Sequence, residues 1–92
     1  MDTVLMLFKQ NLGITHELRD EFFLSVVNAS AKELERKGIV LDLFSVDDQI
    51  LISDYAVYNY HNRFANVPLS QNLQLRIRNR IIKNRAVGGN NA

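Results

Sequence analysis

The apolar residues of this chain recur mainly with the period of an α-helix, and this pattern divides the sequence into four helical segments. The first covers about residues 2–11, where Asp2 or Thr3 can cap a short helix and Leu12-Gly13 ends it. The apolar run from Val4 to Phe8 is dense, so a buried strand is an alternative for this segment.

The second helix, predicted from about His16 to Lys37, has the clearest pattern. Thr15 is a suitable N-cap, acidic residues follow in the first turns, and Gly38 is a natural residue at which to leave a helix. Its apolar face consists of one stripe, Leu18, Phe22, Val26 and Ala29, which is widened by Phe23, Val27 and Leu34.

A third helix is predicted from about Asp47 to His61, after an extended connector. The connector, Ile39 to Phe44, is apolar without a helical period, so we expect it to place hydrophobic side chains under the bundle. Ser45 to Asp48 resembles a capping box in which Ser45 caps the helix and Asp48 reaches back. The helix carries an apolar stripe of Leu51, Tyr55 and Tyr58, flanked by Ile50 and Val57.

A fourth helix is predicted from about Leu69 to Asn84, beyond a loop that ends at Pro68. Every fourth residue on one face is apolar: Leu69, Leu73, Ile77 and Ile81. A strand is the rival interpretation because apolar and polar residues alternate between Leu73 and Ile77, but the segment contains no turn signal. The predicted fold is therefore an all-α bundle of about four helices in one domain, residues 1–85, followed by a flexible tail at 86–92.

Charge is distributed unevenly along the chain. All ten acidic residues lie between Asp2 and Asp54, so residues 1–62, with five basic side chains, have a formal charge of −5. The remainder has a charge of +6 from Arg63, Arg76, Arg78, Arg80, Lys83 and Arg85. Such a chain suits a nucleic-acid partner, or a neighbouring copy of itself packed head to tail.

The basic residues near the carboxyl end are the main candidates for binding a partner. Arg76, Arg80 and Lys83 share one helical face, and no acidic residue in the segment can pair with them at i,i+4 spacing. A solvated helix face is the simplest interpretation, but repulsion between like charges favours an anionic partner, either phosphate or the acidic half of another subunit. Tyr60, beside His61 and Arg63, is a candidate interface aromatic because Tyr and Arg dominate interface hot spots.

The sequence contains no recognisable catalytic or metal-binding set. It has no cysteine, its two histidines lie far apart in the sequence, and no glycine-rich phosphate loop occurs. Helix capping explains the acidic pair Asp47-Asp48. We therefore expect no enzymatic activity, no cofactor and no metal. The apolar run near the amino terminus is too short for a membrane span or a signal peptide, so we expect a soluble protein made in the cytoplasm.

The segment from Phe8 to Leu18 resembles a helix-turn-helix DNA-binding motif, because a helix, a glycine turn and a second helix follow one another. In that motif the amino-terminal residues of the second helix contact the bases. Here those residues include Glu17, Asp20 and Glu21, whose carboxylates would repel the phosphates. The segment is therefore predicted to be structural.

The order of elements resembles the small head–tail connector proteins of tailed bacteriophages, also called head-completion or adaptor proteins. The segment Val4 to Ile14 is similar to the family's opening short helix and its L-x-I break. The segment Asp48 to Tyr60 is similar to its third helix, which is aromatic toward its end, and Asn72 to Lys83 resembles the closing helix. The similarity extends from Val4 to Arg85 and consists mostly of hydrophobic spacing. The arginines of Arg76 to Arg80 exceed the family pattern.

The resemblance implies a structural protein of a phage or prophage that carries out no chemistry. Its copies would form a homo-oligomeric ring, a dodecamer in the virion, although the isolated protein can be monomeric. The ring would lie below the portal at the head–tail junction and would be assembled in the host cytoplasm. Its partners would be the portal protein, the connector proteins nearer the tail, and DNA that passes through the channel without sequence specificity.

A small DNA-binding module is the alternative from a different functional class. In that interpretation the basic carboxyl-terminal helix binds phosphates, and affinity falls steeply with salt. A third class, a regulatory partner protein, has no specific sequence feature in its favour.

Overall fold

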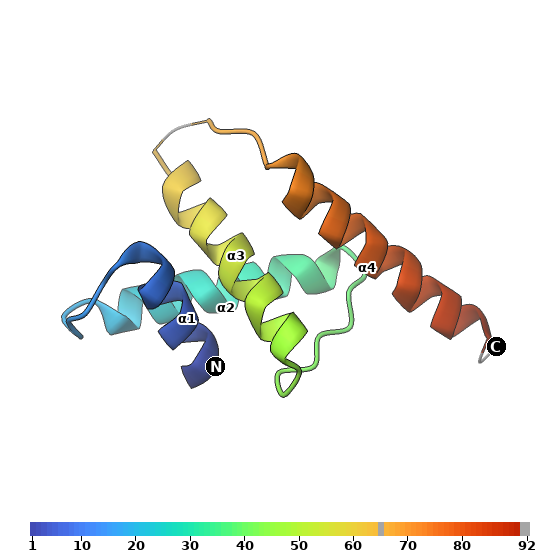
Figure 1. The fold of residues 1–92 in the computed structure, drawn as a ribbon, viewed down its shortest axis with the longest axis horizontal. Coiled ribbons are helices and arrows are strands. Elements are labelled where there is room, and N and C mark those ends of the chain that lie inside the picture. Colours follow the sequence, from blue (N-terminus) through green and yellow to red (C-terminus); the bar gives the residue numbers. More distant parts are fainter. Residues whose placement is uncertain (65, 91–92) are drawn as a thin grey trace.

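The computed structural model describes residues 1–64 and 66–90, with side chains described as far as Asn84. Within these residues the chain forms four α-helices and no strand, which confirms the predicted all-α class (Figure 1). The helices are α1 (Asp2–Leu12), α2 (Asp20–Arg36), α3 (Val46–Asn62) and α4 (Gln71–Asn90). Neither segment for which a strand was an alternative forms one.

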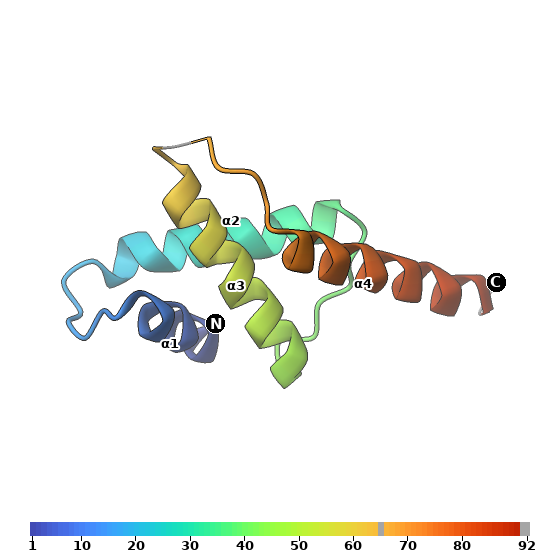
Figure 2. The ribbon, with the colours of Figure 1, turned by 45° about the horizontal axis from the view of Figure 1, so that its top comes forward.

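Helix α3 is the centre of the molecule. It packs against both α1 and α2, which also contact each other. Helix α4 lies across α3 from α1, beside the carboxyl end of α2, and projects past the three-helix body, as Figures 1 and 2 show. The molecule is consequently flat and elongated, with principal extents of 47 × 29 × 18 Å.

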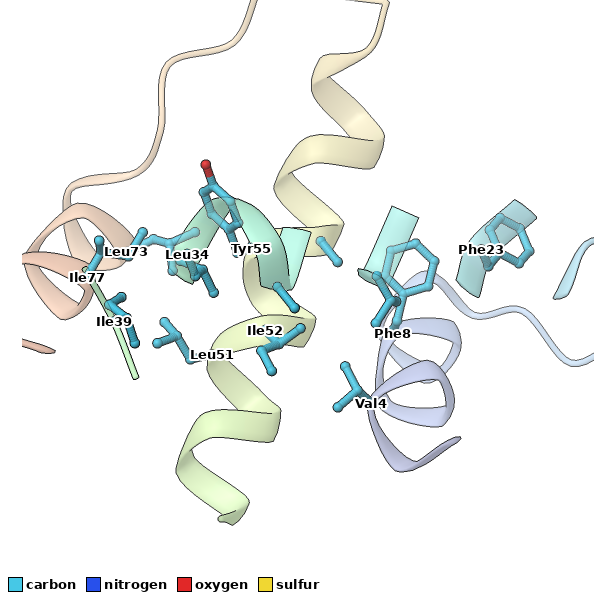
Figure 3. Close-up of a cluster of buried hydrophobic side chains, with 13 residues drawn as sticks. Val4, Phe8, Phe23, Leu34, Ile39, Leu51, Ile52, Tyr55, Leu73 and Ile77 are labelled. Carbon is cyan, nitrogen blue, oxygen red and sulfur yellow. The ribbon is translucent and has the colours of Figure 1, made fainter. Parts of the chain in front are cut away.

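The buried side chains form a continuous core with an aromatic end and an aliphatic end (Figure 3). At the aromatic end the rings of Phe8 from α1 and Phe23 from α2 lie 5.6 Å apart. At the aliphatic end Leu73 and Ile77 of α4 lie beside Ile39 of the connector (Figure 3). Ile81 packs more loosely against this core, so the predicted apolar face is confirmed for the three residues that lie in α4. Leu69 also packs against the core, but it precedes the helix, which begins at Gln71 and not at the predicted Leu69.

Two glycines end the first two helices, as predicted. Gly13 has φ 71° and Gly38 has φ 101°, a backbone region that residues with a Cβ rarely adopt. At the amino end of α4, the Ser70 Oγ accepts a hydrogen bond from the Leu73 N–H at 3.2 Å. The helix then continues to Asn90, six residues past the predicted end at Asn84, because only the modest cost of Gly88-Gly89 opposes helical backbone there.

The start of α2 differs from the prediction. The helix begins at Asp20 instead of His16, and Thr15 does not cap it. The Leu18 N–H donates instead to the His16 Nδ1 at 3.3 Å, which holds a local turn before the helix. Leu18 is consequently 88% exposed, and the buried face of α2 is the one formed by Phe23, Val27, Ala31 and Leu34.

Candidate partner-binding surfaces

Two of the predicted basic residues on α4 bind carboxylates of α3. An Arg76 Nη1 donates to the Asp54 Oδ2 at 2.8 Å, across 22 residues of sequence. The Arg80 guanidinium binds both carboxylate oxygens of Asp48 and also donates to the Val40 carbonyl at 2.9 Å. The anionic compensation expected from a partner is thus supplied, for these two arginines, by the acidic half of the same chain.

Asp48 connects three elements of the fold, namely the connector, α3 and α4. The Asp48 N–H donates to the Ser45 Oγ at 3.5 Å, so Ser45 caps α3 as predicted. Its carboxylate does not reach back to Ser45 but accepts from the Asp42 N–H at 2.6 Å and from Arg80. The hydrogen bond from Arg80 lowers the pKa of Asp48 despite the opposing effect of burial.

The remaining cations of α4 face solvent. Arg78 and Lys83 are exposed and form no ion pair with the described part of the chain. Arg78 lies one turn from the exposed apolar residues Leu75 and Ile82, so this outer side of α4 combines positive charge with apolar surface. The side chain of Arg85 lies outside the described residues.

The predicted pair Tyr60 and Arg63 belongs to an aromatic cluster at the end of α3. The Tyr60 ring packs edge-on against Phe8 and Phe23, with centroids 5.8 and 5.7 Å away. The Arg63 guanidinium lies 3.8 Å from the centroid of the Tyr60 ring and donates to the Tyr60 backbone carbonyl at 2.9 Å. This neighbouring guanidinium lowers the pKa of the Tyr60 hydroxyl against the opposing effect of burial. Tyr60 is therefore anchored in the core at one side, and Arg63 covers its other side.

Of the two tyrosines in the predicted apolar stripe of α3, Tyr55 lies in the core as expected, and Tyr58 packs against the core partly buried. Tyr55 is buried, and this burial, together with the nearby Glu33 carboxylate, raises the pKa of its hydroxyl to about 12. Tyr58 is half-buried and donates from its hydroxyl to the Val67 carbonyl at 2.9 Å. Each hydroxyl therefore lies beside a group of the same chain, Glu33 for Tyr55 and the Val67 carbonyl for Tyr58.

The connector loop, residues 39–45, exposes apolar surface that sequence reasoning missed. Only Ile39 is buried and Leu41 partly buried, whereas Phe44 is 95% exposed. The expectation that the loop places its side chains under the bundle is therefore wrong for most of its residues, because the loop turns outward at Asp42. A signal for this turn exists in the sequence, since Asp readily bonds the backbone two residues on, and here the Phe44 N–H donates to the Asp42 carboxylate at 2.9 Å.

No cluster of three histidine, aspartate or glutamate side chains with the geometry to hold a metal ion occurs in the described part of the chain. Over the same residues, no helix has the length and apolar content needed to cross a membrane.

Comparison with protein-family models, with curated proteins and with solved structures gives no match to this chain.

Proposed function

We propose that this protein is a structural head–tail connector of a tailed bacteriophage or prophage, which forms a ring below the portal. The similarity of the segments 4–14, 48–60 and 72–83 to that family is the sequence support. In this proposal the ring contacts the portal protein on one side and connector proteins nearer the tail on the other. DNA passes through its channel.

The observation that carries the proposal is the apolar surface of the connector loop and the start of α3. Val40, Leu43, Phe44 and Val46 are all exposed within seven residues of sequence. Contiguous exposed apolar residues of this kind are typical of surfaces that another protein covers. A subunit of an assembly has such surfaces, whereas most exposed hydrophobic residues of a monomeric protein are scattered singly.

The alternative, a DNA-binding module, has less support. Arg76 and Arg80 already bind the carboxylates of Asp54 and Asp48, and a phosphate would have to displace those partners. Such an exchange would leave the buried Asp48 carboxylate without its charged partner, which is costly. The Arg76–Asp54 pair is about one third exposed, so separating it costs less. Few cations of α4 are therefore free to neutralise phosphates.

Native mass spectrometry over a range of protein concentrations, with and without a short DNA duplex, tests the proposal. We expect a closed oligomer that forms without DNA. A monomer or dimer that binds the duplex with a steep salt dependence would contradict the connector and favour the DNA-binding module. A monomer that ignores DNA would remove the module and restrict the connector to assembly on a portal template.

A further inference from the structure

The connector loop holds Phe44 in solvent by a set of hydrogen bonds. The Asp42 N–H donates to the Asp48 carboxylate, the Ser45 N–H donates to the Asp42 carbonyl at 3.0 Å, and the Gln49 side-chain amide donates to the Leu43 carbonyl at 2.8 Å. These bonds order both sides of the turn. Binding to a segment whose backbone is already ordered loses less conformational entropy, so an exposed phenylalanine on an ordered turn is well suited to binding.

A groove with suitable chemistry lies elsewhere on the same molecule. It has a volume of about 440 Å³, is open to solvent, and runs along α4 beside the carboxyl end of α2. Its lining combines aliphatic and polar side chains: Lys37, Leu69, Gln74, Ile77, Arg78, Ile81 and Ile82. Grooves of several hundred Å³ hold drug-sized ligands, so this one has room for an aromatic ring and its aliphatic neighbours.

The loop and the groove carry opposite charges. Asp42 and Asp47, both exposed, flank Phe44 in the sequence, and no basic residue occurs between Ile39 and Ile50. Arg80 of α4 lies near these carboxylates but is paired with Asp48, so the loop keeps an excess of negative charge. The groove, in contrast, is lined by Lys37 and Arg78 and by no carboxylate. Complementary charge of this kind orients two surfaces and disfavours pairing of like with like, so it favours contact of a loop with a groove over contact of two loops.

We propose that a second copy of this chain inserts its Phe44 side chain into the groove along α4, with Asp47 of one copy facing Arg78 of the other. The connector begins beside α4, where Val40 binds Arg80, and then runs to its turn at the amino end of α3 (Figure 1). The turn that carries Phe44 and the groove along α4 therefore occupy different parts of the molecule. The contact is therefore head to tail, the type that closes into a ring when the rotation permits. The inference deepens the proposed connector function, on which it rests for its biological setting.

Sedimentation velocity of the full-length protein and of Phe44→Ala tests the contact. Burying a phenylalanine ring stabilises an interface strongly, so the variant should self-associate about 10- to 100-fold more weakly. Phe64→Ala is the matched control, because Phe64 is 86% exposed but lies in the loop after α3. It should associate like the unaltered protein.

Charge reversal tests the orientation of the contact. Asp47→Lys and Arg78→Glu should each weaken association, and the double variant should restore it, because every interface then regains one pair of opposite charges. Circular dichroism and the unfolding midpoint of each variant separate lost association from lost folding.

The results distinguish this contact from the proposed function. A ring that persists in Phe44→Ala overturns the contact and leaves the connector function standing. A Phe44-dependent, charge-restored association that does not close into a ring supports the contact and contradicts the ring. An unaltered protein that stays monomeric at every concentration overturns the contact as a site of self-association.

Discussion

At the residue scale, Asp48 links the connector loop, α3 and α4 through one buried carboxylate. Its side chain is 1% exposed, and Arg80 and the Asp42 N–H bind it. We expect Asp48→Asn to destabilise the protein by about 2 kcal/mol, the range for a hydrogen bond to a charged group. Urea unfolding at pH 7 measures the loss. Asp47→Asn, an exposed neighbour, is the control and should change the stability by less than about 0.5 kcal/mol.

The same carboxylate predicts a dependence of stability on pH. Arg80 lowers the folded-state pKa of Asp48, whereas an unfolded aspartate titrates near about 3.9. The stabilisation is therefore fully present above that unfolded value and is lost as the pH falls through the lower, folded value. Urea unfolding between pH 6 and pH 2.5 should show a steeper fall for the unaltered protein than for Asp48→Asn. Parallel curves for the two proteins would mean that Asp48 is not held in its charged form by the fold.

At the element scale, α4 is attached to the body by a narrow contact. Leu73 and Ile77 enter the core, and Arg76 and Arg80 form ion pairs with α3. We expect Arg80→Met to raise hydrogen exchange of the α4 amides about tenfold or more, because the variant loses the Asp48 and Val40 partners together. Hydrogen-exchange mass spectrometry measures this effect.

Both variants are measured with the protein in its monomeric form, so that the proposed self-association through Arg78 does not contribute. The control is Arg78→Met, since Arg78 is exposed on the outer side of the same helix. It should leave exchange in α4 unchanged. If Arg80→Met raised exchange equally in α1, the effect would be loss of global stability and not release of α4.

The helices could be predicted from the sequence more completely than the contacts between them. Helical periodicity and the positions of Gly13 and Gly38 located four helices, because those signals are local. The start of α2 was misplaced because a histidine ring nitrogen holds a turn there, and His16 carries no ordinary capping signal. The candidate site was predicted only in part, since the partners of Arg76 and Arg80 lie 22 and 32 residues away in sequence. No residue spacing marks such pairs before the helices are placed.

At the scale of the whole molecule, the ion pairs between α3 and α4 join the acidic and basic parts of the chain, and they limit how DNA can be bound. Among the cations of α4 whose side chains are described, only the exposed Arg78 and Lys83 have no carboxylate partner. Arg85 would add a third cation at most. Each phosphate that is neutralised contributes about −0.9 to the slope of log K against log salt. Any binding of a DNA duplex should therefore be weak, with a slope of about −2 to −3, as measured by fluorescence anisotropy between 50 and 200 mM salt.

Arg78→Glu with Lys83→Glu should flatten this slope without disturbing the ion pairs of Arg76 and Arg80, whereas reversing Arg76 and Arg80 would confuse lost binding with release of α4. A slope steeper than about −5 would require more phosphate contacts than these cations supply, and it would favour the DNA-binding module over the connector.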